Sequence, residues 1–396
     1  MSALSNDKHG SSTLEGNYSY TNTLKGVYYG AGSLATALPK LRAKIGGTKA
    51  LIVTGKSLYN NTDVVKKVES ILRSDSNSYG ATFYEIGEHS PIAGIRAGIK
   101  AFRDAGCDFI VAVGGGSPVD ASKAIIYNLH LEEGQGGDKW ESVVKQIAVP
   151  TTLSAAEYTF GAGYTNDEGK KVSVSSPYLA PSGIILDAEL TLPTPERLWL
   201  STGMRAVDHA VENLIRPQMP PTLKPLYYQA LFDLFTYLPK SKADPNNLEY
   251  RMKLQLASWM SLWPFMTEKY SALGISHALG HKLGAAYHIP HGMTSCLTLA
   301  PVVRLQARIA NAEEKEWLAN CLFYLRQAPT GTPEGDITKL AGLIEGLVDD
   351  LGLKTDLAHY NVPKEDAGQI AELALGGKSS ENYDDVVKLL LGLYPA

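Results

Sequence analysis

Four histidines are spaced so that they could act together on one ligand. His277 and His281 are four residues apart and lie on one face of a predicted helix. His291 follows ten residues later, after a proline, and His209 lies in another predicted helix that begins near Thr202. Neutral imidazole binds divalent cations and also carries protons. The spacing therefore predicts either a metal site or a group of histidines that transfers protons.

A glycine-rich segment is suited to binding a phosphate group. VAVGGGSPVDASKAI (111–125) places Gly115, Gly116 and Ser117 between a predicted buried strand and a predicted helix. Glycine lets the backbone approach a phosphate closely, and a helix N-terminus offers free N–H groups and a favourable dipole. Asp120 falls in the first turns of this helix, where it could orient the loop or contact a cofactor. Glycines also serve tight turns alone, so the pattern by itself leaves both uses open.

The elements that must position these residues alternate in the first half of the chain. Helical periodicity is predicted over 62–74 and 91–106, and strands are predicted at 49–55, 81–87, 107–116, 146–152 and 183–190. This alternation predicts a parallel, doubly wound sheet. The loops after its strands meet at one edge, so we expect Thr151 and Thr152 beside the glycine loop.

After about residue 192 the periodicity is helical to the end of the chain, including the stretch 250–286. We therefore predict a polar tail (1–24), a Rossmann-like α/β domain (25–193) and an all-α domain carrying the histidines (194–396). The net charge of −4 argues against nucleic-acid binding. Three scattered cysteines favour a reducing compartment, and the absence of a signal sequence or long apolar run favours a cytoplasmic protein that binds no membrane.

Several motifs together resemble one family. GGGSPVDASKAI, PTT, ILDAELTLP, TGMxAxxHAVE and HALGH…IPHG occur in this order, and at this spacing, in the iron-containing (group III) alcohol dehydrogenases. The resemblance runs over nearly the whole chain. It implies the dehydroquinate synthase-like fold, with an N-terminal α/β domain, a C-terminal helical domain and an active site in the cleft between them. It also suggests a homodimer and a small-molecule substrate.

The resemblance implies roles for particular residues. Gly115, Gly116 and Ser117 would hold the cofactor pyrophosphate. His281 would lie near the nicotinamide. The other residues expected along the cofactor are Asp120, Thr151, Thr152 and Lys171, and the three that match family metal ligands, for iron or zinc, are His209, His277 and His291.

The fourth metal ligand of the family is missing. The family helix has the form TGMDAxxHA, whereas this chain has TGMRAVDHA, so Arg205 stands where the Asp should be. A permanent cation repels a divalent metal, so we expect no metal. Arginine suits carboxylates and polarised oxygens, and could bind the substrate oxygen instead. Alternatively, Arg205 turns away to pair with a carboxylate and leaves a three-histidine metal site. Loss of the Asp is typical of the maleylacetate reductase branch, whereas IPHGMTSC is more typical of the dehydrogenase branch.

A second departure concerns the cofactor. NAD-preferring members carry an Asp where this chain has Gly55, and Lys56 follows it. An acidic residue there would bind the ribose and repel a 2′-phosphate, so its loss favours NADP(H) over NAD(H). A plain turn glycine followed by a solvated lysine is the alternative.

The predicted function is hydride transfer from NAD(P)H to a carbonyl or an activated C=C of a small oxygenated substrate. Arg205 and His209 would stabilise the developing oxyanion, and His281 or His277 would relay a proton, with His291 nearby. The alternative is a non-redox enzyme or a binding protein on the same fold, with Arg205 and the histidines as acid and base.

Overall fold

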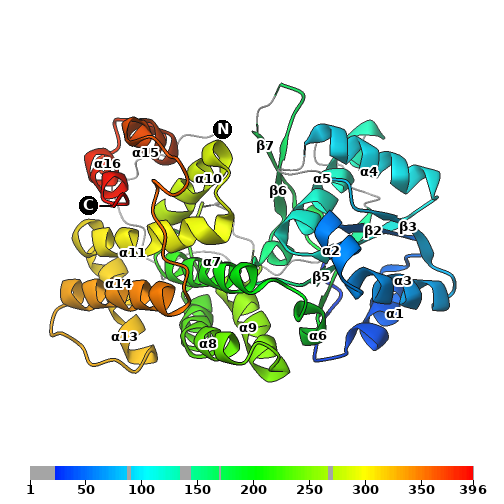
Figure 1. Ribbon diagram of the computed structural model, residues 1–396, viewed down its shortest axis with the longest axis horizontal. Helices are drawn as coiled ribbons and strands as arrows, with labels where there is room; N and C mark the ends of the chain where they lie inside the picture. The colour runs from blue at the N-terminus through cyan, green and yellow to red at the C-terminus, as the bar shows by residue number, and fades with distance from the viewer. Residues whose placement is uncertain (1–22, 87–90, 134–143, 169–170, 266–270, 396) are drawn as a thin grey trace. The chain divides into compact units, whose positions relative to one another are not determined.

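The described chain has one part built on a parallel sheet and one part built of helices (Figure 1). The computed structural model describes residues 23–86, 91–133, 144–168, 171–265 and 271–395. The α/β unit extends to Thr194 and also takes in Asn246–Gln255, and the helical unit comprises Pro195–Pro245 and the chain from Leu256 onward. The predicted fold class is confirmed.

A six-stranded sheet with the order β1-β8-β5-β4-β2-β3 is the frame of the α/β unit. All its paired neighbours are parallel. Its strands are β1 (Val27–Tyr29), β2 (Ala50–Thr54), β3 (Tyr79–Phe83), β4 (Phe109–Gly114), β5 (Lys145–Pro150) and β8 (Gly183–Leu186). β2, β4, β5 and β8 are apolar and almost fully buried, as expected of a sheet covered on both faces.

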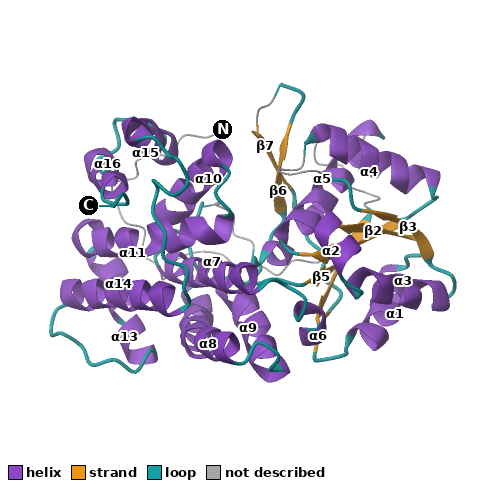
Figure 2. Cartoon of the chain, viewed as in Figure 1, coloured by secondary structure: helices purple, strands orange, loops and turns teal. Residues whose placement is uncertain are grey.

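Helices cover both faces of this sheet (Figure 2). One hydrophobic cluster joins the sheet to α1 and α3, and a second joins the opposite face to α4 and α5. The helices of the unit are α1 (Leu34–Ile45), α2 (Lys56–Asn61), α3 (Val64–Ser74), α4 (Ile92–Asp104), α5 (Gly116–Glu132) and α6 (Ala188–Thr191).

One local prediction for this unit was wrong, and one feature was not predicted. The predicted strand at 183–190 ends at Leu186, because the Asp187 carboxylate accepts the Glu189 N–H (3.1 Å) and caps the short helix α6. The segment after β5 forms the 3₁₀ turn η1 (Ala156–Tyr158) and an antiparallel hairpin of β6 (Gly161–Thr165) and β7 (Lys171–Ser175), which the sequence pattern did not predict. The turn η2 (Pro177–Leu179) precedes β8.

In its described residues the helical unit contains no strand. Its first helix begins at Glu196, not near Thr202 as predicted, because Pro195 precedes it and Glu196 suits a helix N-terminus. The stretch 250–286 is not one helix, since α9 ends at Ser261 and α10 starts at Ile275. The helices are α7 (Glu196–Leu214), α8 (Lys224–Ala243), α9 (Leu248–Ser261), α10 (Ile275–Tyr287), α11 (His291–Ile309), α12 (Ala312–Ala319), α13 (Cys321–Tyr324), α14 (Pro333–Asp350), α15 (Ala367–Leu375) and α16 (Tyr383–Leu391), with 3₁₀ turns η3 (Pro221–Leu223) and η4 (Lys364–Asp366).

Within the part of the chain that the structure describes, no helix is both long enough and apolar enough to cross a membrane.

Candidate active site

The predicted phosphate loop lies directly against the loop after β5. β4 and β5 run in register to Gly114 and Pro150, and the Thr151 N–H donates to the Gly114 carbonyl (2.9 Å). A Cβ atom on Gly115 would lie 3.1 Å from the Thr152 side chain, a tight contact, so this approach favours glycine. The structure therefore brings Gly115 and Thr152 together, as the sequence predicted.

The start of α5 is open to an anion. Gly115 is its N-cap residue and has no side chain to bind the first N–H groups of the helix. Gly116 and Ser117 form the first turn, and Asp120 follows one turn later, held by Lys123 (3.2 Å). Free N–H groups and the helix dipole suit a phosphate oxygen. These residues fit the pyrophosphate of a dinucleotide.

The remaining predicted cofactor residues are Gly55, Lys56 and Lys171. Gly55 is the N-cap of α2, nothing lies within 4 Å of a Cβ built on it, and Lys56 begins that helix with an exposed side chain. Lys171 is the first residue of β7, and its side chain lies outside the described part of the chain.

The four histidines predicted for the site form two pairs. The rings of His209 on α7 and His277 on α10 are 4.8 Å apart between centroids, and both residues are buried. The rings of His281 and His291 are 5.5 Å apart, and both residues are exposed. The structure thus brings together two of the three histidines that match metal ligands, and pairs the third with His281.

Arg205 lies in the buried part of this cluster with a carboxylate and a hydroxyl as partners. Its Nη1 donates to Ser295 Oγ (3.3 Å) and lies 3.5 Å from Asp208 Oδ2. The same Asp208 oxygen accepts the hydroxyl groups of Ser295 (2.6 Å) and Ser276 (3.0 Å). Asp208 therefore joins α7 to both α10 and α11 and provides the countercharge of Arg205.

Glu212 fixes His277. Its Oε2 lies 2.6 Å from His277 Nδ1, and its Oε1 accepts the Ser276 N–H (2.7 Å) at the start of α10. With the Nδ1 proton held by a carboxylate, Nε2 is the atom that His277 has available for a ligand or a proton. Among the described residues neither His277 Nε2 nor His209 Nδ1 has a hydrogen-bond partner.

The pKa values of the two buried histidines are shifted in opposite directions. Burial lowers the pKa of His209 well below its usual value, and the charges of His277 and Arg205 lower it further. Burial and Arg205 also lower the pKa of His277, but Asp208 and Glu212 outweigh them and raise it above its usual value. Of the two, His277 is the one suited to hold a proton.

The donor set does not fit a divalent cation in the way that the resemblance implies. In the described chain, the one trio of His, Cys, Asp or Glu whose donor atoms all lie within 4.8 Å of one another is Asp208, Glu212 and His277. Arg205 already neutralises Asp208, and Glu212 already binds the His277 ring. A second cation beside the guanidinium would be repelled in this buried environment.

Sequence reasoning missed the carboxylates that organise this cluster. On one helix Asp208 lies about 100° around the axis from His209, and Glu212 lies about one turn further along, so helical spacing alone does not place them in the cluster. The partners that draw them into the cluster, Ser276 and Ser295, come from α10 and α11. The available signal was Asp208, an acidic residue three positions after Arg205 on the same predicted helix.

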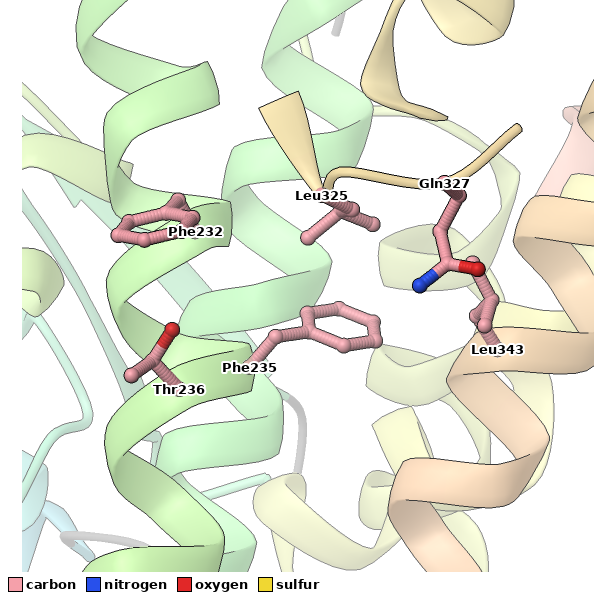
Figure 3. A pocket seen from close by; sticks show the side chains of 6 residues that line it. All are labelled: Phe232, Phe235, Thr236, Leu325, Gln327 and Leu343. Atoms are coloured by element: carbon pink, nitrogen blue, oxygen red, sulfur yellow. The ribbon is translucent and has the colours of Figure 1, made fainter. Parts of the chain in front are cut away.

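The pocket shown in Figure 3 lies elsewhere in the helical unit. It has a volume of about 220 Å³ and is lined by Phe232, Phe235 and Thr236 of α8, by Leu325 and Gln327, and by Leu343 of α14. None of these side chains titrates, so the pocket has no group for acid–base chemistry.

Comparisons with known proteins cover both units. The profile of iron-containing alcohol dehydrogenases matches residues 25–188, and that of the family's C-terminal part matches 199–390. The 1,3-propanediol dehydrogenase of Citrobacter freundii is 32% identical over 340 residues, covering 84% of this chain and 86% of that protein. Maleylacetate reductase 1 of Cupriavidus pinatubonensis is 25% identical over 349 residues, covering 88% of each. A crystal structure of 1,3-propanediol oxidoreductase has a TM-score of 0.83 at 26% identity, covering 96% of this chain and all (100%) of that one.

Proposed function

This chain belongs to the iron-containing alcohol dehydrogenase family, a family of nicotinamide-dependent oxidoreductases, and we propose that it is a metal-independent reductase that holds its substrate with Arg205. The substrate is a small molecule with a carbonyl or an activated C=C, and it carries an anionic oxygen. Of two relatives, maleylacetate reductase is named for an anionic substrate, which supports this proposal, whereas 1,3-propanediol dehydrogenase is named for an uncharged one.

The proposal rests on the contacts that the Arg205 side chain makes and on the donors that these contacts leave over. Both of its contacts within the described chain involve Nη1, so the N–H groups of Nε and Nη2 remain for another acceptor. Ser295 and Asp208 orient the guanidinium before any substrate binds. A preorganised donor in a buried site stabilises negative charge more strongly than the same donor in water.

The cofactor residues support a nicotinamide dinucleotide, with NADP(H) favoured. Gly115, Gly116 and Ser117 would hold the pyrophosphate, and Thr152 would lie along the cofactor. Lys56 at the start of α2 would attract a 2′-phosphate, since the acidic residue of NAD-preferring members is replaced by Gly55. When bound, the nicotinamide supplies the hydride.

The protein's own residues would supply the rest of the chemistry. The remaining donors of Arg205 would bind the anionic oxygen of the substrate and the oxygen on which negative charge develops. His277 holds a proton at Nε2, with Glu212 fixing Nδ1, and delivers it to that oxygen as the charge grows. His209 stays neutral beside it, because burial lowers its pKa.

Steady-state oxidation of NADPH and NADH by the chelator-treated protein tests the activity. Substrates are carboxylate-bearing ketones, with uncharged ketones of matched size as the comparison. We expect faster turnover of the carboxylates, a loss of about 10²–10³-fold in kcat/KM for Arg205→Ala, and a partial loss for Arg205→Lys, which keeps the charge without the planar fork. A wild-type activity that chelation abolishes would contradict the proposal.

Metal analysis provides an independent test. Wild type should carry far less than one equivalent of iron or zinc, whereas Arg205→Asp restores the family's acidic ligand and should bind close to one equivalent. Arg205→Ala, which removes the charge without adding a ligand, should fall between the two. Stoichiometric metal in the wild type would show that Arg205 does not replace the metal.

A further inference from the structure

We propose that Lys123 is a positioning residue for the cofactor, because it locks the segment after β5 onto the helix that carries the phosphate loop. The inference rests on the proposed nicotinamide binding. It concerns a residue that contacts neither of the expected phosphate-binding glycines.

Lys123 is fully buried on α5, and its ammonium group has four acceptors. Nζ donates to the carbonyl groups of Ala156 (2.7 Å) and Gly161 (3.1 Å) and to Thr159 Oγ1 (2.8 Å). It also lies 3.2 Å from Asp120 Oδ1, one turn earlier on its own helix. Two of the four acceptors therefore lie between β5 and β6, and a third is the first residue of β6.

This segment is held at two ends. At its start, the Thr151 N–H bonds to the Gly114 carbonyl, which continues the sheet. At its far end, Lys123 connects the segment to α5 through the carbonyl groups of Ala156 and Gly161. Thr152, expected along the cofactor, lies between these two anchors. Lys123 thus fixes the distance between Thr152 and the start of α5.

The backbone of the segment needs such an anchor. Ala155 has φ +62°, a left-handed conformation that costs a non-glycine residue free energy. Ala155 is fully buried and is followed directly by Ala156, whose carbonyl Lys123 binds. Without the lysine, the chain could relax at this point, and the Thr152 loop would lose its fixed position.

Burying an ammonium group costs free energy, so filling space in the core is a weak explanation for Lys123. A methionine could fill the same volume, but it could not bind three acceptors at once. Lys123 also holds the partly exposed Asp120 carboxylate at the start of α5. One side chain thereby connects both sequence segments that we expect to contact the cofactor.

The test compares Lys123→Met with Lys224→Met in the full-length protein. Lys224 is a matched control, since it is also buried and donates to one carbonyl, that of Leu214 (2.6 Å), but in the helical unit. Both variants should lower the unfolding temperature. Calorimetric titration with NADP⁺ should give a Kd raised by about 10–100-fold in Lys123→Met alone, as expected for the loss of charged hydrogen bonds.

Two further readouts separate positioning from general destabilisation. In Lys123→Met, KM for the cofactor should rise while kcat at saturating cofactor stays within about twofold, and amide hydrogen exchange should speed up selectively over 151–161. Thr159→Val removes one acceptor and keeps the lysine. It should raise Kd by a smaller factor, and it provides the test if Lys123→Met does not fold.

The outcomes separate the two proposals. A wild type that binds NADP⁺, with an unchanged Kd in the Lys123→Met or Thr159→Val variant, overturns the role of Lys123 and leaves the proposed function standing. An equal rise in Kd for Lys224→Met also overturns it, because the effect would then follow stability. A wild type that binds neither NADP⁺ nor NAD⁺ overturns both proposals.

Discussion

Arg205 is stable in its buried position because Asp208 stands three residues later on the same helix. Removing a guanidinium from water costs several kcal/mol. A carboxylate 3.5 Å away returns about 5 kcal/mol at an effective dielectric constant near 20, which is of the same size. Burial lowers the pKa of Arg205, but an arginine stays charged at any physiological pH. The pair is therefore a fixed dipole, suited to binding an anion without large rearrangement.

Glu157 gives the α/β unit a pH dependence of the opposite sign to that of an ordinary surface acid. Burial raises its pKa to about 7, above the usual value of 4.5 for a glutamate. Because the folded protein holds this proton more tightly, the stabilisation is complete below about pH 4.5 and is lost as the pH rises through about 7. The loss is at most ~3.5 kcal/mol. Urea unfolding of wild type and Glu157→Gln between pH 4.5 and 8 measures it.

Glu157→Gln should remove this dependence, since an amide does not titrate. The difference in unfolding free energy between variant and wild type should therefore change steadily across the range, in favour of the variant at high pH. A difference that is independent of pH would show that Glu157 titrates normally in the folded protein.

At this scale the sequence predicts residue types better than their partners. Gly115 and Thr152 could be predicted to meet, because parallel strands bring the loops after them to one edge. Asp208 could not be assigned, because its role depends on hydroxyl groups 68 and 87 residues away along the chain. Helical spacing describes only the neighbours on one helix.

Among the elements, α10 approaches its neighbours closely at Gly280. A Cβ there would lie 2.8 Å from Thr294 Oγ1 on α11 and 3.5 Å from Arg205 Nη1. Thr294 is β-branched and buried, so it can move little. Gly280→Ala should destabilise the protein by about 1–3 kcal/mol, and kcat/KM should fall as Arg205 is displaced. Thermal unfolding and initial rates measure the two effects.

Gly342 on α14 provides the control for this substitution. It is also inside a helix, but nothing lies within 4 Å of a Cβ built on it. Gly342→Ala should therefore stabilise the protein by about 0.5–1 kcal/mol, because alanine is the better helix former. If Gly280→Ala stabilised the protein as Gly342→Ala does, α10 and α11 would not be in close contact at Gly280.

Element predictions succeeded where the hydrophobic period was long and regular. α3 and α4 each bury one face of a clear helical repeat, and β2 and β4 are continuous apolar runs. The β6–β7 hairpin was missed because GAGYT contains two glycines and little apolar alternation. α6 was missed because its four residues are too few for any period to appear.

Over the whole molecule, the chain enters the α/β unit twice. It leaves after Thr194, forms α7 and α8, and returns with Asn246–Gln255 before continuing in the helical unit. α9 (Leu248–Ser261) therefore has its first half in one unit and its last turns in the other. Helical periodicity cannot reveal this division, because it describes which face of a helix is buried and not against which unit.

Arg251 connects this returning segment to α6 of the α/β unit. It is buried, and its Nη1 donates to the carbonyl (2.9 Å) and the hydroxyl (3.2 Å) of Thr191 at the end of α6. Arg251→Met leaves both acceptors without this donor, and should lower the unfolding free energy of the α/β unit by about 2–3 kcal/mol. Hydrogen exchange at the amides of β5 and β8 should accelerate with it.

Arg304, which is exposed, provides the control for Arg251→Met, because its substitution removes a charge without disturbing the core. Arg304 makes two hydrogen bonds to Glu345 (2.8 and 2.7 Å), but its side chain is 45% exposed. Arg304→Met should cost no more than about 1 kcal/mol, because solvent screens a surface ion pair. If Arg251→Met cost as little, or accelerated exchange only in the helical unit, the segment 246–255 would not be an integral part of the sheet domain. Equal acceleration in both units would instead show that the whole chain unfolds as one cooperative structure.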